Sequence, residues 1–110
     1  MSYPLIQSLE ILMKTDKITE IGIDGDERLY VVPEKEQFSM IWRSASEVHW
    51  NADLKCLYSP KPREWSYYQW YYHIIDVVRD EYGCKLSLDG DTKWINVPDQ
   101  VRSQIYNDHL

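Results

Sequence analysis

Cysteines and long apolar stretches are scarce in this sequence. Its two cysteines, Cys56 and Cys84, are far apart and lack the CxxC spacing of redox and metal sites, so we expect reduced thiols. No apolar run is long enough to span a bilayer, and no basic segment followed by an apolar one opens the chain. These absences predict a cytoplasmic protein without a membrane partner.

The motifs of widespread catalytic sites are absent as well. The sequence has no P-loop, dinucleotide-binding fingerprint, nucleophile elbow or HExxH motif. Its formal net charge of -6 argues against nucleic acid as a partner, because phosphate contacts need a basic face. The same charge permits a basic protein partner or a small organic or cationic ligand. We predict no cofactor and no metal site, and we favour a non-enzymatic protein.

Aromatic residues that carry a polar atom are abundant by contrast. Among 110 residues there are nine Tyr and five Trp but one Phe. Tyr and Trp suit places where one edge of a ring is buried and the other meets a polar group, such as interfaces and ligand pockets. With 44% hydrophobic and 27% charged residues, the chain has a globular balance, and its length fits a single domain over residues 1–110.

Hydrophobic periodicity predicts three helices. Residues 2–14 carry leucines at helical spacing after an early proline. Residues 59–83 form the longest helical pattern, with Pro62 near its start and Gly83 as its C-cap. Residues 97–110 begin with Val-Pro-Asp, which is typical of a helix start, and predict a final helix.

Strand patterns fill the intervals between these helices. Residues 17–32 predict a hairpin with its turn at Asp24–Asp26, and residues 84–96 predict a second hairpin with Asp89-Gly90 at its turn. Residues 36–59 predict two further strands. The first of these two strands alternates apolar side chains on one face: Phe38, Met40 and Trp42. Strands joined by short turns pair antiparallel. The predicted fold class is therefore α+β, an antiparallel β-sheet with a long aromatic-rich helix and two shorter helices packed against it.

The long helix carries the first candidate site. At about 100 degrees per residue, most of its apolar side chains fall on one arc that can pack on the sheet. This arc consists of Tyr67, Trp70, Tyr71, Ile74, Ile75, Val77, Val78 and Tyr82. Trp65 and Tyr72 fall outside the arc, Tyr68 lies at its edge, and Arg79 continues the same line.

The stripe of Trp65, Tyr68, Tyr72 and Arg79 needs cover from the terminal helices, another subunit or a ligand. Trp, Tyr and Arg are the residue types that dominate binding hot spots, so the stripe is a candidate self-association or ligand-binding surface. An aromatic cage for a cationic ligand is one form of this hypothesis. Packing by the chain's own terminal helices is the structural alternative.

Two further groups of polar residues invite a chemical interpretation. Glu47 and His49 alternate onto one predicted strand face, where the carboxylate could tune and orient the imidazole. A solvated sheet face accounts for the same two residues, and we favour it. His73 with Asp76 and Asp80 has spacing that helical metal ligands could use, but a charged solvent face explains it and we favour that reading.

Four features follow one another in a distinctive order. An acid-x-x-Trp strand precedes a Pro-Arg-x-Trp segment, an aromatic helix ends in Glu-Tyr-Gly, and a Trp-x-Asn-x-Pro segment follows. The residues concerned are Glu47, Trp50, Pro62, Arg63, Trp65, Glu81, Tyr82, Gly83, Trp94, Asn96 and Pro98. Over about the last two-thirds of the chain, this order resembles small proteins encoded by mobile integron gene cassettes. The resemblance implies a stand-alone α+β domain, often oligomeric and accessory in role, with no catalytic residue to carry over.

These features lead to three functional hypotheses. The first is a non-enzymatic binding module, a homo-oligomer, whose working surface includes the aromatic stripe. The second is an acidic immunity or antitoxin-like protein that blocks a basic effector, which requires one coherent acidic face. The third is a small enzyme that uses Glu47 and His49, or His73 with its neighbouring acids, which requires one of these groups to line a pocket. We favour the first.

Overall fold

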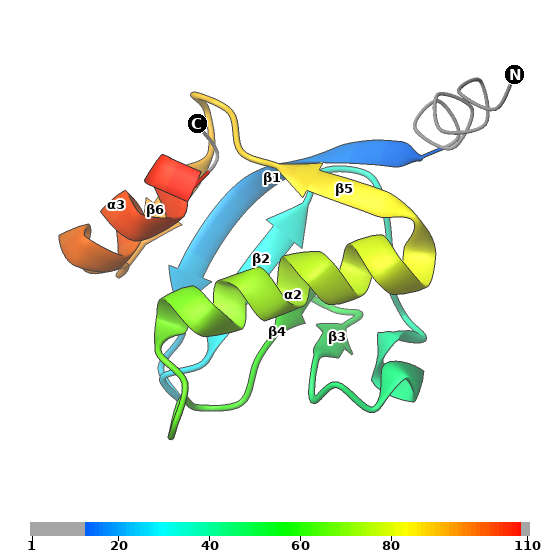
Figure 1. The fold of residues 1–110 in the computed structure, drawn as a ribbon, viewed down its shortest axis with the longest axis horizontal. Helices are drawn as coiled ribbons and strands as arrows, with labels where there is room; N and C mark the ends of the chain where they lie inside the picture. Colours follow the sequence, from blue (N-terminus) through cyan, green and yellow to red (C-terminus); the bar gives the residue numbers. More distant parts are fainter. Residues whose placement is uncertain (1–12, 109–110) are drawn as a thin grey trace, which may run out of the picture.

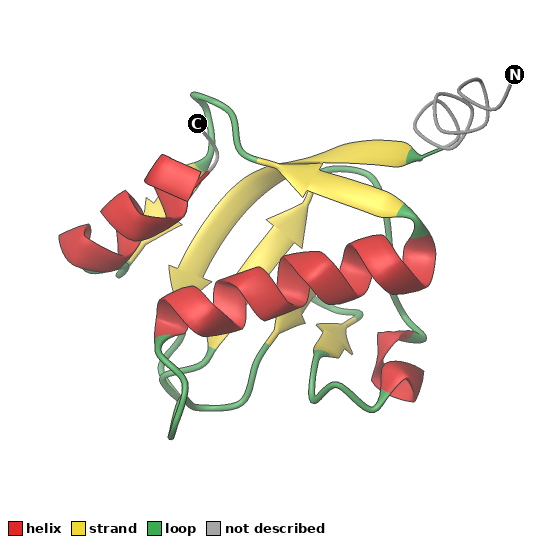
Figure 2. Ribbon diagram, in the orientation of Figure 1, coloured by secondary structure: helices red, strands yellow, loops and turns green. Residues whose placement is uncertain are grey.

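Strand β1 (Lys14–Ile23) is the centre of the sheet. The computed structural model describes residues 13–108, and in this part of the chain six strands form one mixed sheet. The strand order is β3-β4-β2-β1-β5, and β6 also pairs with β1. Figure 1 follows the strands in sequence colours, and Figure 2 shows the long helix α2 lying across one face of the sheet.

The first two strands form the predicted hairpin. β2 (Leu29–Pro33) pairs antiparallel with β1. In the turn, Asp24 Oδ1 accepts hydrogen bonds from the backbone amides of Asp26 and Arg28, both at 2.9 Å. Arg28 Nε donates to Asp24 Oδ2 at 3.0 Å. The Asp24 carboxylate therefore satisfies the backbone of the turn, and the predicted hairpin is confirmed.

The next two strands are shorter than the sequence pattern suggests. β4 (Cys56–Tyr58) pairs antiparallel with β2, and β3 (His49–Asn51) pairs antiparallel with β4. Asn51 Oδ1 accepts hydrogen bonds at 3.0 Å from the amides of Asp53 and Leu54, which closes the turn between them. The pair of strands predicted in this region is confirmed only for these six residues.

The strand predicted around Phe38, Met40 and Trp42 is wrong. Residues Ile41–Ser44 form the 3-10 helix η1 instead, and Ser44 Oγ donates to the Ile41 carbonyl at 2.8 Å. Phe38 and Ile41 are buried, whereas Met40 and Trp42 are exposed. The buried positions are thus three residues apart, as a 3-10 turn requires, and not two apart as in a strand.

The second predicted hairpin, residues 84–96, is also wrong. β5 (Cys84–Ser87) and β6 (Lys93–Ile95) both run parallel to β1, one after the other along the same edge. The loop between them is tied to β1 because Thr92 Oγ1 donates to the Ile18 carbonyl at 2.7 Å. A strand-turn-strand pattern fits a hairpin and an interrupted edge strand equally well, so local sequence does not separate them.

The predicted fold class is corrected accordingly. The sheet is mixed and not antiparallel, and in residues 13–108 it is accompanied by two α-helices, not by one long and two shorter ones. The helix predicted over residues 2–14 lies outside the described residues except at its end, where Lys14 already begins β1. The long α2 crossover returns the chain to the far side of β1, and this crossover makes β5 parallel to β1.

Helix α2 (Tyr67–Tyr82) buries the predicted arc against the sheet. Its buried side chains are Trp70, Tyr71, Ile74 and Val78. They meet the sheet side chains Ile18, Ile21, Leu29, Val31 and Leu57 in one core. Burying each aliphatic or aromatic side chain stabilises the fold by about 1.5–3 kcal/mol. Within residues 13–108, neither α-helix combines the length and hydropathy needed to cross a membrane.

The last helix closes the end of the sheet beside β6. α3 (Asp99–Asp108) contacts α2 and places Ile105 in the core with no exposed surface. On its outer side, the Arg102 guanidinium lies 5.3 Å from the centre of the Trp94 ring. Tyr106 lies near the same ring, at 6.3 Å. The predicted final helix is confirmed, and Trp94 has a structural role as its contact.

Tyr30 on β2 covers a glycine of the central strand. Gly22 pairs with Tyr30 across the two strands, and a Cβ at Gly22 would overlap the Tyr30 ring and hydroxyl. The phenol hydroxyl donates to Glu20 Oε2 at 2.6 Å. A strand glycine is expected where a ring or backbone approaches closely, and here the ring supplies the missing cover.

We predict that Gly22→Ala lowers the free energy of unfolding by about 1–3 kcal/mol, because the Tyr30 ring must shift. Gly25→Ala is the matched control, since a Cβ there meets nothing within 4 Å; we expect a change within about 0.5 kcal/mol. Urea unfolding followed by circular dichroism measures both. Equal stability of the two variants would contradict the packing described.

Candidate functional site

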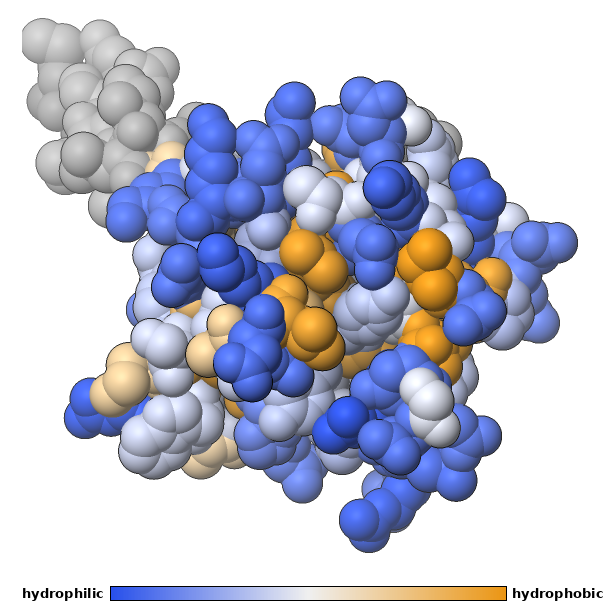
Figure 3. All heavy atoms as spheres, turned by 180° about the vertical axis from the view of Figure 1, so that it is seen from behind, coloured by the Kyte–Doolittle hydropathy of each residue, from blue (hydrophilic) through white to orange (hydrophobic). Residues whose placement is uncertain are grey.

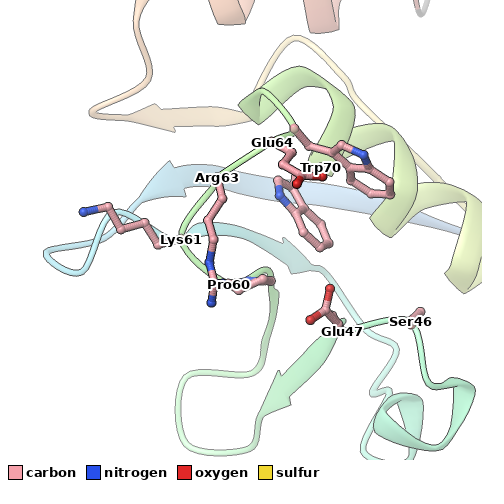
Figure 4. Close-up of a pocket in the computed structure, with 8 residues that line it drawn as sticks. Ser46, Glu47, Pro60, Lys61, Arg63, Glu64 and Trp70 are labelled. Atoms are coloured by element: carbon pink, nitrogen blue, oxygen red, sulfur yellow. The ribbon is translucent and has the colours of Figure 1, made fainter.

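A cleft of about 360 Å³ lies between the start of α2 and two loops. The loop before β3 forms one wall, and the segment between β4 and α2 forms the other (Figure 4). The lining residues are Ser46, Glu47, Pro60, Lys61, Arg63, Glu64, Trp65 and Trp70. Two of the predicted site residues, Glu47 and Trp65, therefore share one cavity.

Two indole rings line one side of this cleft, and the His73 ring packs against both. The ring centres of Trp65 and Trp70 are 4.7 Å apart, and His73 lies 5.0 Å from Trp65 and 5.6 Å from Trp70. Trp70 is 6% exposed and belongs to the core, whereas Trp65 is 41% exposed. Trp65 therefore presents an aromatic surface to solvent on a rigid, buried support.

The N-terminal cap of α2 sets the position of Trp65. The Ser66 hydroxyl accepts a hydrogen bond from the Gln69 amide at 3.2 Å, and Gln69 Oε1 accepts one from the Ser66 amide at 2.8 Å. This reciprocal capping box fixes the point where the helix begins, at Tyr67. Trp65 precedes the cap, so helical geometry does not apply to it, and it turns back onto Trp70.

His73 connects α2 to the loop that carries Glu47. His73 Nε2 lies 2.9 Å from the Ser46 carbonyl oxygen, and since a carbonyl only accepts, Nε2 carries the proton. The loop has two residues in the left-handed region, Ala45 at φ 56° and Glu47 at φ 62°. Non-glycine residues rarely adopt this conformation, which here turns the chain so that Glu47 lines the cleft.

The charged side chains at the rim of the cleft differ in whether an ion-pair partner already neutralises them. Lys61 Nζ lies 2.5 Å from Glu27 Oε2, and this hydrogen bond raises the pKa of Lys61. In Figure 4, Lys61 extends away from Ser46 and Glu47. The Lys61 charge is thus matched outside the cleft, and the ionisable groups left at the cleft are Glu47, Glu64 and Arg63.

The rest of the predicted stripe lies elsewhere on α2. Tyr68 and Tyr72 are half-buried and contact each other at 5.0 Å between ring centres. Arg79 pairs with Asp76 at 3.4 Å and with Asp80 at 3.3 Å. The structure therefore separates the stripe into an indole in the cleft, a tyrosine pair and an ion-paired arginine. The continuous stripe assumed that Trp65 belongs to the helix, and the cap at Ser66 excludes this.

Glu47 and His49 do not meet. The His49 ring stacks on Tyr58 at 5.2 Å, on the sheet face opposite α2, whereas Glu47 lines the cleft beside α2. β3 begins at His49, so Glu47 precedes the strand. The alternation of side chains between the two sheet faces therefore does not apply to Glu47. Among residues 13–108, no group of three or more His, Cys, Asp or Glu side chains could hold a metal ion.

Sequence reasoning missed three of the residues that shape the cleft. Trp70 was assigned to the core, which is correct, but its indole also supports the exposed Trp65 ring. Glu64 could have been found from the sequence, because it is an acid next to Trp65, the indole that falls outside the buried arc of the helix. Ser46 contributes its backbone carbonyl to His73, and no side-chain pattern signals such a contact.

Comparison with known proteins places the chain in a family. The family model described as integron cassette protein Hfx_Cass5 matches residues 16–92. A solved structure, the integron cassette protein Hfx_Cass5 from the mobile metagenome of North West Arm Sewage Outfall, is 43% identical in sequence. That similarity covers 86% of this chain and 95% of that one, with a TM-score of 0.46. No curated protein matches the sequence.

The chain belongs to the Hfx_Cass5 family of integron cassette proteins, whose function is not known. This confirms the predicted resemblance. The matched range includes Glu47, Trp50, Pro62–Trp65 and Glu81–Gly83, which are most of the residues that carried it. The Trp-x-Asn-x-Pro segment at Trp94 lies beyond the matched range.

We predict that Ser66→Ala lowers the free energy of unfolding by about 0.5–2 kcal/mol, because the Gln69 amide loses its acceptor at the helix start. Ser103→Ala, at an exposed position within α3, is the control and should be neutral or slightly stabilising. Urea unfolding measures both. If the two substitutions have the same effect, the cap does not hold the segment that carries Trp65.

Proposed function

We propose that this protein is a small non-enzymatic binding module whose cleft receives an organic cation. The observation that carries the proposal is an exposed indole, Trp65, supported by the buried indole of Trp70 and flanked by Glu47 and Glu64. The face of an indole attracts a cation through its quadrupole, and the attraction grows as the site loses water. The two carboxylates outnumber Arg63, the base of the cleft left unmatched among the described residues, so the net charge at the rim also favours a cation.

The dimensions and the backbone of the cleft support this proposal. Its volume of about 360 Å³ falls in the range of small-molecule sites, about 300–1,000 Å³. Glu47 adopts a left-handed conformation, with φ at 62°. A sparsely populated conformation costs about 1–3 kcal/mol and tends to occur at binding and catalytic sites. A glutamate held this way at the rim of an aromatic cleft is consistent with a ligand-binding role.

Charge pairing favours this hypothesis over an acidic immunity protein. Such a protein needs one coherent acidic face, but several acids of the described surface are paired with bases. The ion pairs are Lys17–Asp89, Arg28–Asp24, Arg28–Asp26, Lys35–Glu34, Lys61–Glu27, Arg79–Asp76 and Arg79–Asp80. An enzyme that uses Glu47 with His49 has no support from the geometry, because the two side chains lie in different places.

Tetramethylammonium tests the proposal, with tert-butanol as its neutral counterpart of similar shape. We expect tetramethylammonium to shift the Trp65 indole resonance in NMR titrations more strongly and at lower concentration than tert-butanol. In the variants, binding is followed at the backbone amides of Ser46 and Glu64, because Trp65→Ala removes the indole reporter. Trp65→Ala should weaken binding about fivefold, since a partly desolvated cation–π contact is worth about 1 kcal/mol, and Glu47→Gln should weaken it by up to about fivefold through the loss of an exposed charge.

The control for these variants is Trp42→Ala, at an indole that is 60% exposed and lies outside the cleft. It should leave the titration unchanged. Equal responses to the cation and to the alcohol, or a loss caused by Trp42→Ala as large as that caused by Trp65→Ala, would refute the assignment.

We also propose that the protein is a cytoplasmic homo-oligomer. The half-buried pair of Tyr68 and Tyr72 and the exposed ring of Trp65 supply residue types that dominate subunit contacts. Cys56 and Cys84 are both free and buried, and burial raises the pKa of each thiol. Protonated, buried thiols fit a reducing compartment.

Light scattering on the wild type, Tyr72→Ala and Trp65→Ala tests self-association. We expect the wild type to exceed the monomer mass and Tyr72→Ala to shift toward it while circular dichroism stays unchanged. If Trp65→Ala loses cation binding but keeps the wild-type mass, the cleft and the subunit contact are separate. A monomeric wild type at all accessible concentrations would refute the oligomer.

A further inference from the structure

The sheet face opposite α2 carries a second hollow. In β2, Leu29 and Val31 are buried beneath α2, so the alternate residues Tyr30 and Val32 point to the other face. Together with residues of β1 and β4, the end of β3 and its turn, and Ile95–Asn96 at the end of β6, they form a groove of about 400 Å³. Figure 3 views the molecule from this side and shows hydrophobic side chains gathered near the middle of the face.

The floor of the groove is apolar. Ile23, Val32, Ile95 and Cys56 all line it, and Ile95 is 40% exposed. Cys56 is 4% exposed, and burial raises the pKa of its thiol to about 11, so the sulfur is neutral at pH 7. An aliphatic chain placed here would cover these side chains from water, which is favourable in proportion to the apolar area buried.

One side of the floor is bounded by a carboxylate held in place. The Tyr30 hydroxyl donates to Glu20 Oε2 at 2.6 Å. Burial, and then this hydrogen bond, raise the pKa of the Tyr30 hydroxyl, so it stays protonated and continues to donate. The Tyr30 ring is itself fixed over Gly22. Glu20 therefore offers its other oxygen and its charge at the edge of an apolar floor.

The positive charge of the groove is already matched. Arg28 Nε lies 3.0 Å from Asp24, Arg28 Nη2 lies 3.3 Å from Asp26, and the guanidinium lies 5.0 Å from the centre of the Tyr58 ring. Burial tends to raise the pKa of Asp24, but hydrogen bonds from the Arg28 and Asp26 amides and from the Arg28 side chain lower it below its usual value. Asp24 is therefore ionised, and the lining is negative once Glu20 is included.

We infer that this groove binds a small aliphatic primary amine, with the ammonium group at Glu20 and the chain over Ile23, Val32 and Ile95. An ammonium group has three N–H donors and no acceptor, which suits a carboxylate that already accepts from a tyrosine. The volume of about 400 Å³ accommodates a short alkyl chain. The site lies on the other face of the sheet from the Trp65 cleft, so the inference does not depend on the function proposed for that cleft.

Three probes of equal chain length separate charge from hydrophobicity: hexylamine, 1-hexanol and hexanoate. The full-length protein is titrated with each while backbone amide shifts are followed by NMR. We expect hexylamine to bind about fivefold more tightly than 1-hexanol, as one exposed charge pair allows, and hexanoate to bind least. The shifts should be concentrated at Tyr30, Val32 and Ile95.

Two pairs of variants test the assigned roles. Glu20→Gln keeps an acceptor for the Tyr30 hydroxyl but should reduce the affinity for hexylamine to that for 1-hexanol. Glu34→Gln is its control: the Glu34 carboxylate pairs with Lys35, and its loss should leave both affinities unchanged. Ile95→Ala should weaken hexylamine and 1-hexanol alike, by about two- to fivefold, because it removes shared apolar contact. Its control is Met40→Ala, at an exposed side chain that lies outside the groove.

The inference is overturned if hexanoate or 1-hexanol binds as tightly as hexylamine. It is also overturned if Glu34→Gln weakens the amine as much as Glu20→Gln does. Shifts confined to Ser46, Glu47 and Pro60–Trp65 would assign the amine to the cleft and leave the groove without this ligand.

Discussion

The central strand β1 must have hydrogen-bond partners on both of its edges, and the other elements are arranged to provide them. β2 satisfies one edge through a local turn. The second edge is satisfied by β5 and then β6, which the chain reaches only after crossing one face of the sheet as α2. That crossing covers one face with a helix and leaves much of the other open. The cleft at the start of the helix and the groove on the uncovered face both follow from this arrangement.

The turn between β1 and β2 lines the groove and supports the segment that lines the cleft. On one side, Glu27 pairs with Lys61, and its carbonyl accepts a hydrogen bond from the Tyr67 hydroxyl at 3.0 Å. On the other side, Asp24 and Arg28 line the groove of the open face. Glu27 reaches the helix side because its backbone is in the left-handed region, with φ at 63°. A short segment of five residues thus supports the walls of two chemically different sites.

Aromatic residues with polar atoms serve distinct purposes in this protein. Tyr30 supplies a hydroxyl to a carboxylate and a ring to cover a glycine. Tyr67 and Tyr82 each donate a hydrogen bond to backbone or accept one from it, while their rings pack against the core. Trp94 anchors α3, so only part of the Tyr and Trp excess is available for binding. Among residues 13–108, the Tyr and Trp side chains that remain exposed are Trp42, Trp65 and Tyr106.

Local sequence was sufficient for features that depend on neighbours in the chain. The buried arc of α2, the β1–β2 hairpin and the C-cap at Gly83 each follow from periodicity or turn chemistry within a few residues. Tertiary structure alone decided that β5 and β6 run parallel to β1, and that Glu47 and Trp65 face one cleft while His49 lies on the opposite face. The reason is physical: strand direction and the meeting of distant side chains depend on which edges and faces the rest of the chain has already covered, and no local pattern contains that information.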